Sequence, residues 1–188
     1  MSEALDLLGD PIMTRGGVCG RRAYRPVAAL GPGPSPLVIG CNPSTADGLK
    51  DDQTSLWWNA WFYLLGFGGY DAVNLYPFCT ASPAECRKRV GAIAGGDWHA
   101  RDQLHFVKPA RLTELAKAAN QVFVCWGNIA WDWDWIEHVV EEIQSGVRGI
   151  RTSGAGGQTK SGAPIHPASR GKHRIPRDQQ PIIWRKAA

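Results

Sequence analysis

The sequence predicts an α/β fold built on a mostly parallel, buried sheet, and two patterns support this prediction. Short apolar runs with the composition of strands recur along the chain, at residues 37–39, 71–75, 122–125 and 147–151. Helical patterns separate these runs, and a helical crossover between strands is typical of parallel pairing. Because no Pro/Gly/Ser linker divides the 188 residues into two periodic regions, we expect one domain, residues 1–188.

Each helix is predicted from a cap, an apolar stripe or a stop signal. Residues 51–54 can cap a helix that carries Trp57, Trp58 and Trp61, mainly as core residues, and ends at the glycine-rich residues 66–69. Three further helical patterns follow, from Pro83 to Val90, over residues 97–119 with an interruption at Pro109, and from Ile136 to Ile143. The first 30 residues give little periodic signal, although Tyr24-Arg25 can form an ordered edge.

The composition excludes some classes of protein. No apolar run approaches the ~20 residues that a membrane-spanning helix needs, so we expect no membrane insertion. Five cysteines, odd in number and widely spaced without a CxxC pair, indicate a reducing, cytoplasmic location. Cys41 and Cys125 are expected to be buried apolar side chains rather than nucleophiles. No metal-binding spacing is recognised, and we predict no metal and no cofactor.

Basic side chains gather in the C-terminal segment, residues 160–188, of a chain with a formal net charge of +4. A cluster of this sign can hold the phosphates of a nucleic acid. A terminal basic run is also a common solvated tail. Charge alone leaves both interpretations open.

A polar turn follows the first predicted strand, in the stretch PLVIGCNPSTAD at residues 36–47. The strand cannot continue through this stretch, because Pro43 lacks a donor for the β-ladder and Gly40 favours a turn. In open α/β sheets, ligands bind at the carboxyl ends of the strands. The short polar side chains of the turn are therefore candidate site residues, unless they serve only as turn formers and a helix cap; they are Asn42, Ser44, Thr45 and Asp47.

Four segments place a polar turn or loop in a similar context. They are Gly40-Cys41-Asn42-Pro43-Ser44, Asn74-Leu75-Tyr76-Pro77, Trp126-Gly127-Asn128-Ile129-Ala130 and, late in the chain, His166-Pro167-Ala168-Ser169. Taken in order, they resemble the motifs of the uracil-DNA glycosylase superfamily. Together with the CG, YR, DD and GAPIHP peptides, they are also similar to a family catalogued only as a domain of unknown function, over roughly residues 19–170.

The resemblance implies both a fold and an activity. The fold is a three-layer sandwich with a central, mostly parallel four-stranded sheet flanked by helices, and the activity is cleavage of the N-glycosidic bond of a base flipped out of DNA. By resemblance, Asn42 holds or activates water, His166 hydrogen-bonds the base carbonyl oxygen, and Asn74 reads the pyrimidine edge. Arg170 takes the place of a wedge residue that enters the duplex.

The candidate site residues fall into three groups by this resemblance. The catalytic candidates are Asn42, His166 and Asp47. The substrate-binding candidates are Gly40, Cys41, Pro43, Ser44, Asn74 and Tyr76. The DNA-binding candidates are Ser169, Arg170, Lys172 and Arg174. Structural alternatives remain, since Asn74 can satisfy backbone groups at a strand end and His166 can be a surface loop residue.

Two positions depart from the strict uracil enzymes. Asn42 stands where those enzymes have a carboxylate, which implies slower hydrolysis unless Asp47, Asp51 or Asp52 supplies the charge. Ser44 stands where a bulky aromatic side chain blocks substituents at pyrimidine C5, so the resemblance implies a C5-modified pyrimidine as substrate. No lysine lies within the motifs to form a Schiff base, and we therefore expect a monofunctional glycosylase.

Two other functions stay open at this point. One is an enzyme of modified-base metabolism that acts on free nucleotides or nucleosides. The other is a noncatalytic reader of modified DNA bases, which Asn42 in place of a carboxylate supports. The expected partner is DNA, and a monomer is favoured.

Overall fold

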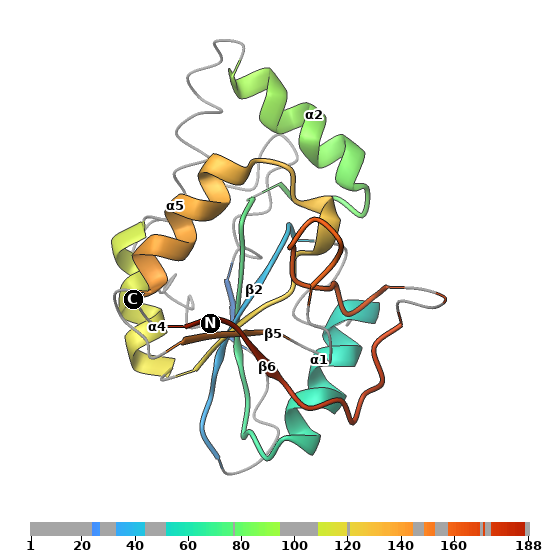
Figure 1. The fold of residues 1–188 in the computed structure, drawn as a ribbon. Coiled ribbons are helices and arrows are strands. Elements are labelled where there is room, and N and C mark those ends of the chain that lie inside the picture. Colours follow the sequence, from blue (N-terminus) through green and yellow to red (C-terminus); the bar gives the residue numbers. More distant parts are fainter. Residues whose placement is uncertain are drawn as a thin grey trace, which may run out of the picture.

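The structure is a computed structural model, shown in Figure 1. It describes residues 24–26, 33–43, 52–76, 78–94, 109–119, 121–144, 149–152, 158–169, 171 and 174–186. The strands are β1 (Tyr24–Pro26), β2 (Leu37–Gly40), β3 (Asp71–Asn74), β4 (Val122–Val124), β5 (Gly149–Thr152) and β6 (Ile182–Lys186). The helices are α1 (Gln53–Leu64), α2 (Pro83–Ala94), α4 (Pro109–Ala119) and α5 (Trp133–Gln144), with a short 3₁₀ helix η2 (Gly127–Ile129).

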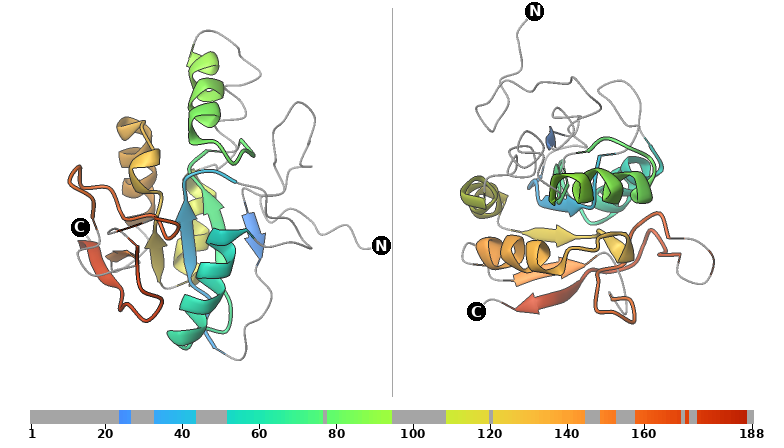
Figure 2. Two further views of the ribbon diagram at one scale, coloured as in Figure 1. Left: turned by 90° about the vertical axis from the view of Figure 1, so that its right-hand side faces the viewer. Right: turned by 90° about the horizontal axis from the view of Figure 1, so that it is seen from above.

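Within the described residues, the strands form one sheet in the order β1-β3-β2-β4-β5-β6. The neighbours β3, β2, β4 and β5 pair in parallel, whereas β1 and β6 pair antiparallel with β3 and β5. The right-hand view of Figure 2 shows β4 (yellow), β5 (orange) and β6 (red) side by side, with β6 at the edge. The prediction of a mixed α/β fold on parallel strands is confirmed.

The number of strands differs from the four predicted, because short antiparallel strands extend the sheet on both sides. Tyr24 and Arg25 do form an edge strand, as their sequence allowed. Strand β6 was not predicted, since its basic residues were assigned to a basic terminal segment. Its apolar residue Trp184 is instead buried against the core, with 8% of its surface exposed.

Alternate residues of the central strands face opposite sides of the sheet, which builds two apolar clusters. Leu37 and Ile39 of β2 pack with residues of α2, α4 and α5, whereas Val38 packs with residues of α1. Helix α1 therefore covers one face, and α4 and α5 cover the other, as Figure 1 shows. This alternation follows from the two-residue period of a strand whose faces are both buried.

Helix α1 begins and ends where its sequence predicts. Asp52 is the N-cap, and its side chain accepts a hydrogen bond of 2.8 Å from the backbone N–H of Ser55. Gly66, just past the C-cap, adopts a φ of +79°, a conformation that glycine reaches without strain. The three tryptophans of α1 are each at most 7% exposed, which confirms their assignment mainly to the core.

The other predicted helices lie close to their expected bounds. Helix α2 begins at Pro83 as predicted but continues to Ala94, and α4 starts at Pro109, which a first-turn proline permits. The part of the predicted helix before Pro109, residues 97–108, lies outside the described residues. Among the described helices, none is long and apolar enough to cross a lipid bilayer.

Candidate functional site

The carboxyl ends of β2, β3 and β4 lie side by side at one edge of the sheet. Gly40 is the register partner of Asn74, and Ile39 is the partner of Val124. The pairing continues past the strands, since the N–H of Leu75 donates to the Gly40 carbonyl at 3.0 Å and the N–H of Cys125 donates to the Ile39 carbonyl at 3.0 Å. The turns that follow the three strands are therefore neighbours.

Gly40 brings the side chain of Asn74 across the end of β2. A Cβ atom built on Gly40 would lie 2.7 Å from Oδ1 of Asn74, closer than real Cβ contacts allow. Glycine leaves this space to the Asn74 side chain without any shift of that side chain. The Asn74 amide, predicted to read a pyrimidine edge, is thus held at the edge of the sheet where β2 and β3 end.

The amide of Asn42 is fixed by backbone carbonyls. Its Nδ2 atom donates to the carbonyl oxygens of Pro43 at 2.9 Å, Phe78 at 3.3 Å and Thr80 at 2.7 Å. These bonds orient the amide, so that its nitrogen faces the chain after β3 and its Oδ1 remains as an acceptor. An acceptor oxygen can orient a water molecule, but an amide cannot take up the proton of that water.

His166 lies in a tight turn that determines its protonation and tautomer. The N–H of Ser169 donates to the His166 carbonyl at 3.0 Å, and the N–H of Ala168 donates to Nδ1 of the ring at 3.1 Å. Burial lowers the pKa of His166 to about 4, and the nearby charge of Asp52 opposes this shift. The ring is therefore neutral at pH 7 with its proton on Nε2, where it can donate a hydrogen bond.

Gly127 connects the His166 turn to the end of β4. Its N–H donates to the Pro164 carbonyl at 2.9 Å, and a Cβ atom built on it would lie 2.8 Å from Cβ of His166. Gly127 also has a φ of +66°. The Trp-Gly turn after β4 and the His166 turn are thus in direct contact, on the same edge of the sheet as Asn42 and Asn74.

Two predicted substrate-binding residues have side chains that are packed in the core. The ring of Tyr76 is fully buried and stacks on Trp131, with ring centres 4.3 Å apart and planes 7° apart. The Tyr76 hydroxyl accepts a hydrogen bond of 3.2 Å from the N–H of Asp132. The Cys41 thiol is buried in the same apolar cluster, and burial raises the pKa of both groups. Their role in substrate binding stays a prediction, and since both side chains are packed in the core, it would fall to their backbone groups.

The remaining predicted residues divide between the core, the pocket and the undescribed part of the chain. Gly40 and Pro43 are buried at the end of β2. Burial also raises the pKa of Cys125, which is an apolar core residue as expected. Five predicted site residues lie outside the described residues: Ser44, Thr45, Asp47, Arg170 and Lys172.

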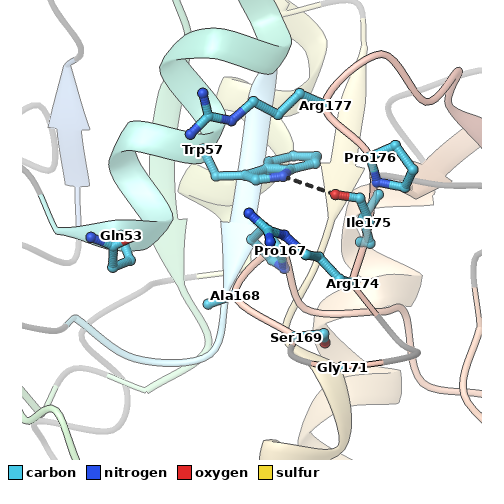
Figure 3. Close-up of a pocket in the computed structure, with 10 residues that line it drawn as sticks. All are labelled: Gln53, Trp57, Pro167, Ala168, Ser169, Gly171, Arg174, Ile175, Pro176 and Arg177. Atoms are coloured by element: carbon cyan, nitrogen blue, oxygen red, sulfur yellow. Dashed lines mark hydrogen bonds between the residues drawn. The ribbon is translucent and has the colours of Figure 1, made fainter.

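An open pocket of about 810 Å³ lies next to the His166 turn, between α1 and the C-terminal segment (Figure 3). Ser169 and Arg174, both predicted to bind DNA, line it. Trp57 and Arg177 also line it and were not among the predicted site residues. A basic cluster in the sequence includes Arg177, but no local pattern places that residue opposite α1. Within the described residues, no group of three side chains is arranged to hold a metal ion.

The comparison with protein families gives a match over most of the chain. Residues 30–168 match the model of a family described as a protein of unknown function (DUF1643). The chain belongs to this family. The searches of curated proteins and of solved structures gave no match.

The DUF1643 match contains every turn that meets at the edge of the sheet. It begins before β2 and ends at Ala168, so it includes the Asn42, Asn74, Gly127 and His166 turns. The pocket residues 174–177 and strand β6 lie beyond it. The expected likeness to a family of unknown function is therefore confirmed.

Proposed function

We propose that this DUF1643 protein is a monofunctional DNA glycosylase-like hydrolase that releases a flipped, C5-modified pyrimidine from DNA. One observation carries the proposal: the Asn42, Asn74, Gly127 and His166 turns gather at the carboxyl edge of neighbouring parallel strands. These are the four segments that resemble the uracil-DNA glycosylase superfamily. The position of α1 on one face and of α4 and α5 on the other supports the three-layer sandwich of that superfamily.

The chemistry of His166 fits the departure of a base. When the N-glycosidic bond breaks, its electron pair leaves with the base, and negative charge develops on the base carbonyl oxygens. A neutral imidazole that donates from Nε2 can stabilise this charge by a hydrogen bond, and the Nδ1 bond from the N–H of Ala168 holds the ring in that tautomer. Because burial keeps the pKa of His166 near 4, the donor is present in the same form throughout the neutral pH range.

Asn42 and Asn74 fit the other two requirements. Oδ1 of Asn42 can orient a water molecule toward C1′ of the sugar, where the water oxygen forms the new bond and its proton passes to solvent. The amide of Asn74 offers a donor and an acceptor, which matches the edge of a pyrimidine. Because Asn42 takes up no proton, the proposed hydrolysis is slower than that of the strict uracil enzymes, which it resembles.

The test is the release of a base from oligonucleotides that differ only at pyrimidine C5. The full chain is incubated with each oligonucleotide, abasic sites are scored by alkaline cleavage, and liberated bases are identified by mass spectrometry. We expect release of a C5-substituted base, and its loss in His166→Ala and Asn42→Ala with DNA affinity retained. Lys117→Ala, an exposed substitution on α4, serves as the control with unchanged release.

Other outcomes would contradict the proposal in recognisable ways. Strict preference for unmodified uracil would reject the assignment of the C5 substituent. Action on free nucleotides without release from DNA would indicate an enzyme of modified-base metabolism. Tight binding of modified DNA without any liberated base would indicate a noncatalytic reader, the alternative that the amide of Asn42 supports.

A further inference from the structure

The pocket beside the His166 turn is formed by two segments that are far apart in sequence. Gln53 and Trp57 come from the first turns of α1, and Arg174, Ile175 and Arg177 come from the C-terminal segment. Its volume of about 810 Å³ lies in the range of small-molecule sites, and it is much larger than a phosphate needs. Asn42, Asn74 and His166 do not line it, so it is separate from the proposed reaction site.

The tryptophans of α1 fix the C-terminal wall of this pocket. Nε1 of Trp57 donates to the carbonyl of Ile175 at 3.4 Å, and Nε1 of Trp61 donates to the carbonyl of Gln179 at 2.7 Å. The two indoles also pack on one another, with ring centres 5.1 Å apart. Because these bonds join α1 to the segment that carries Arg174 and Arg177, the pocket is a feature of the fold itself.

The charge of the pocket is positive. Figure 3 shows Arg174 and Arg177 reaching from the C-terminal segment toward α1, with the Trp57 ring between them. Both arginines are exposed, and among the described residues neither guanidinium has an ion-pair partner. No carboxylate lines the pocket, although Asp52 and Asp178 are chain neighbours of lining residues. Two guanidinium groups of this kind match a phosphate, to which arginine can donate two hydrogen bonds at once.

We infer that this pocket binds an unpaired nucleotide that neighbours the flipped one, so that the protein prefers single-stranded DNA to a duplex. The inference rests on the proposed function for the flipped base. Arg174 and Arg177 hold the phosphate, and the base lies against Pro167, Pro176 and the small part of the Trp57 side chain that lines the pocket, where Trp57 is 7% exposed. Pro167 follows His166 directly and lines the pocket, which puts this nucleotide next to the reacting one.

The shape of the pocket explains the preference for a single strand. In a duplex, the neighbour of a flipped nucleotide stays paired and stacked, and its base cannot enter a cavity in the protein. In a single strand, successive bases are free to separate and to pack on side chains. A flat basic surface would serve a duplex equally well, whereas a pocket of this volume favours a strand whose bases can turn outward.

The test measures the affinity of the full chain for a fluorescein-labelled, unmodified 12-nucleotide thymidine strand and for its duplex with an adenosine strand. Fluorescence anisotropy is recorded over a series of salt concentrations. We expect tighter binding of the single strand, and a loss of about tenfold in its affinity for each of Arg174→Ala and Arg177→Ala. Each substitution should also lower the dependence of log Kd on log salt, and both together by about 0.7, the value for one single-strand phosphate contact.

Two matched variants test the geometry. Lys117→Ala removes one positive charge on the opposite face of the sheet and should leave both affinities unchanged. Arg174→Lys keeps the charge but loses the planar fork, and we expect an intermediate affinity. Melting temperatures close to that of the parent chain would show that the exposed substitutions leave the fold intact.

Equal losses for strand and duplex, or unchanged affinity in both arginine variants, would overturn the inference. Its failure is distinguishable from failure of the proposed hydrolysis. If bases are released while both arginine variants bind normally, only the neighbouring-nucleotide pocket is rejected. If no base is released but the arginine variants lose single-strand affinity selectively, the pocket stands and the hydrolase is rejected.

Discussion

The contact between Gly127 and His166 makes the position of the histidine testable without any substrate. In Gly127→Ala, the new Cβ would lie 2.8 Å from Cβ of His166, which forces the turn to move. Since the atom that it meets is the first of the side chain, rotation of the histidine cannot relieve the overlap. The φ of +66° adds a separate penalty of about 1–2 kcal/mol for any residue with a Cβ.

Gly66→Ala is the matched control for this substitution. Gly66 has a φ of +79°, but a Cβ atom built on it would meet nothing within 4 Å. It therefore carries the backbone penalty alone. For a chain of this length, 1 kcal/mol corresponds to about 2–4 °C in melting temperature, so Gly66→Ala should lower it by about 2–8 °C. Gly127→Ala should lower it further, by the cost of displacing the His166 turn.

The second measurement is the pKa of His166 by NMR titration in both variants. Burial lowers this pKa to about 4 in the parent chain, so a displaced, better hydrated ring should titrate closer to 6.5 in Gly127→Ala. Gly66→Ala should leave the pKa unchanged. Equal melting temperatures in the two variants, together with the same His166 pKa, would refute the close approach of the two turns.

Three further predictions concern the site and its support. Asn42→Asp should lower the free energy of unfolding in urea by about 1–3 kcal/mol, because a carboxylate would face the carbonyls that now accept from Nδ2. For the same reason we expect base release to be no faster in this variant. Faster release would contradict this prediction. The pKa of His166 is about 4 in the folded chain and 6.5 in the unfolded chain. Its contribution to the free energy of unfolding is therefore complete above pH 6.5 and is lost as the pH falls toward 4. His166→Gln should flatten the curve of unfolding free energy against pH between these two values. Trp184→Ala should lower the free energy of unfolding in urea by about 3–5 kcal/mol, because the ring packs edge-on to Trp126 in the core. Glu137→Gln should lower it by less than about 1 kcal/mol, because the ion pair of Glu137 with Arg185 is partly exposed.

The parts of the fold that were predicted correctly depend on local chemistry. The apolar run of residues 37–39 forms β2, and the cap at Asp52 starts α1, because each signal lies within a few residues of its effect. Parallel pairing followed from the helices between strands. Strand β6 was missed because its partner β5 lies 30 residues earlier, and nothing local distinguishes Ile182–Lys186 from a basic tail.

The site was predicted in part for the same reason. The position of Asn42 and Asn74 at strand ends could be read from the sequence, and the pairing of β2 with β3 brings them to one edge. The direction of the Tyr76 side chain could not, because it depends on Trp131, a residue far along the chain that stacks on it. The pocket between α1 and residues 174–177 likewise joins segments that no local pattern connects.

Two glycines explain why four individually weak motifs carry a combined meaning. Gly40 of the first motif leaves the space that Asn74 of the second occupies, and Gly127 of the third leaves the space that His166 of the fourth occupies. Each glycine therefore leaves room for the polar residue of another motif. The strand pairing of β2 with β4 then brings the two pairs to one edge. Contacts in space thus link the four motifs in pairs. Their combination is therefore a more specific signature of this site than any single tetrapeptide.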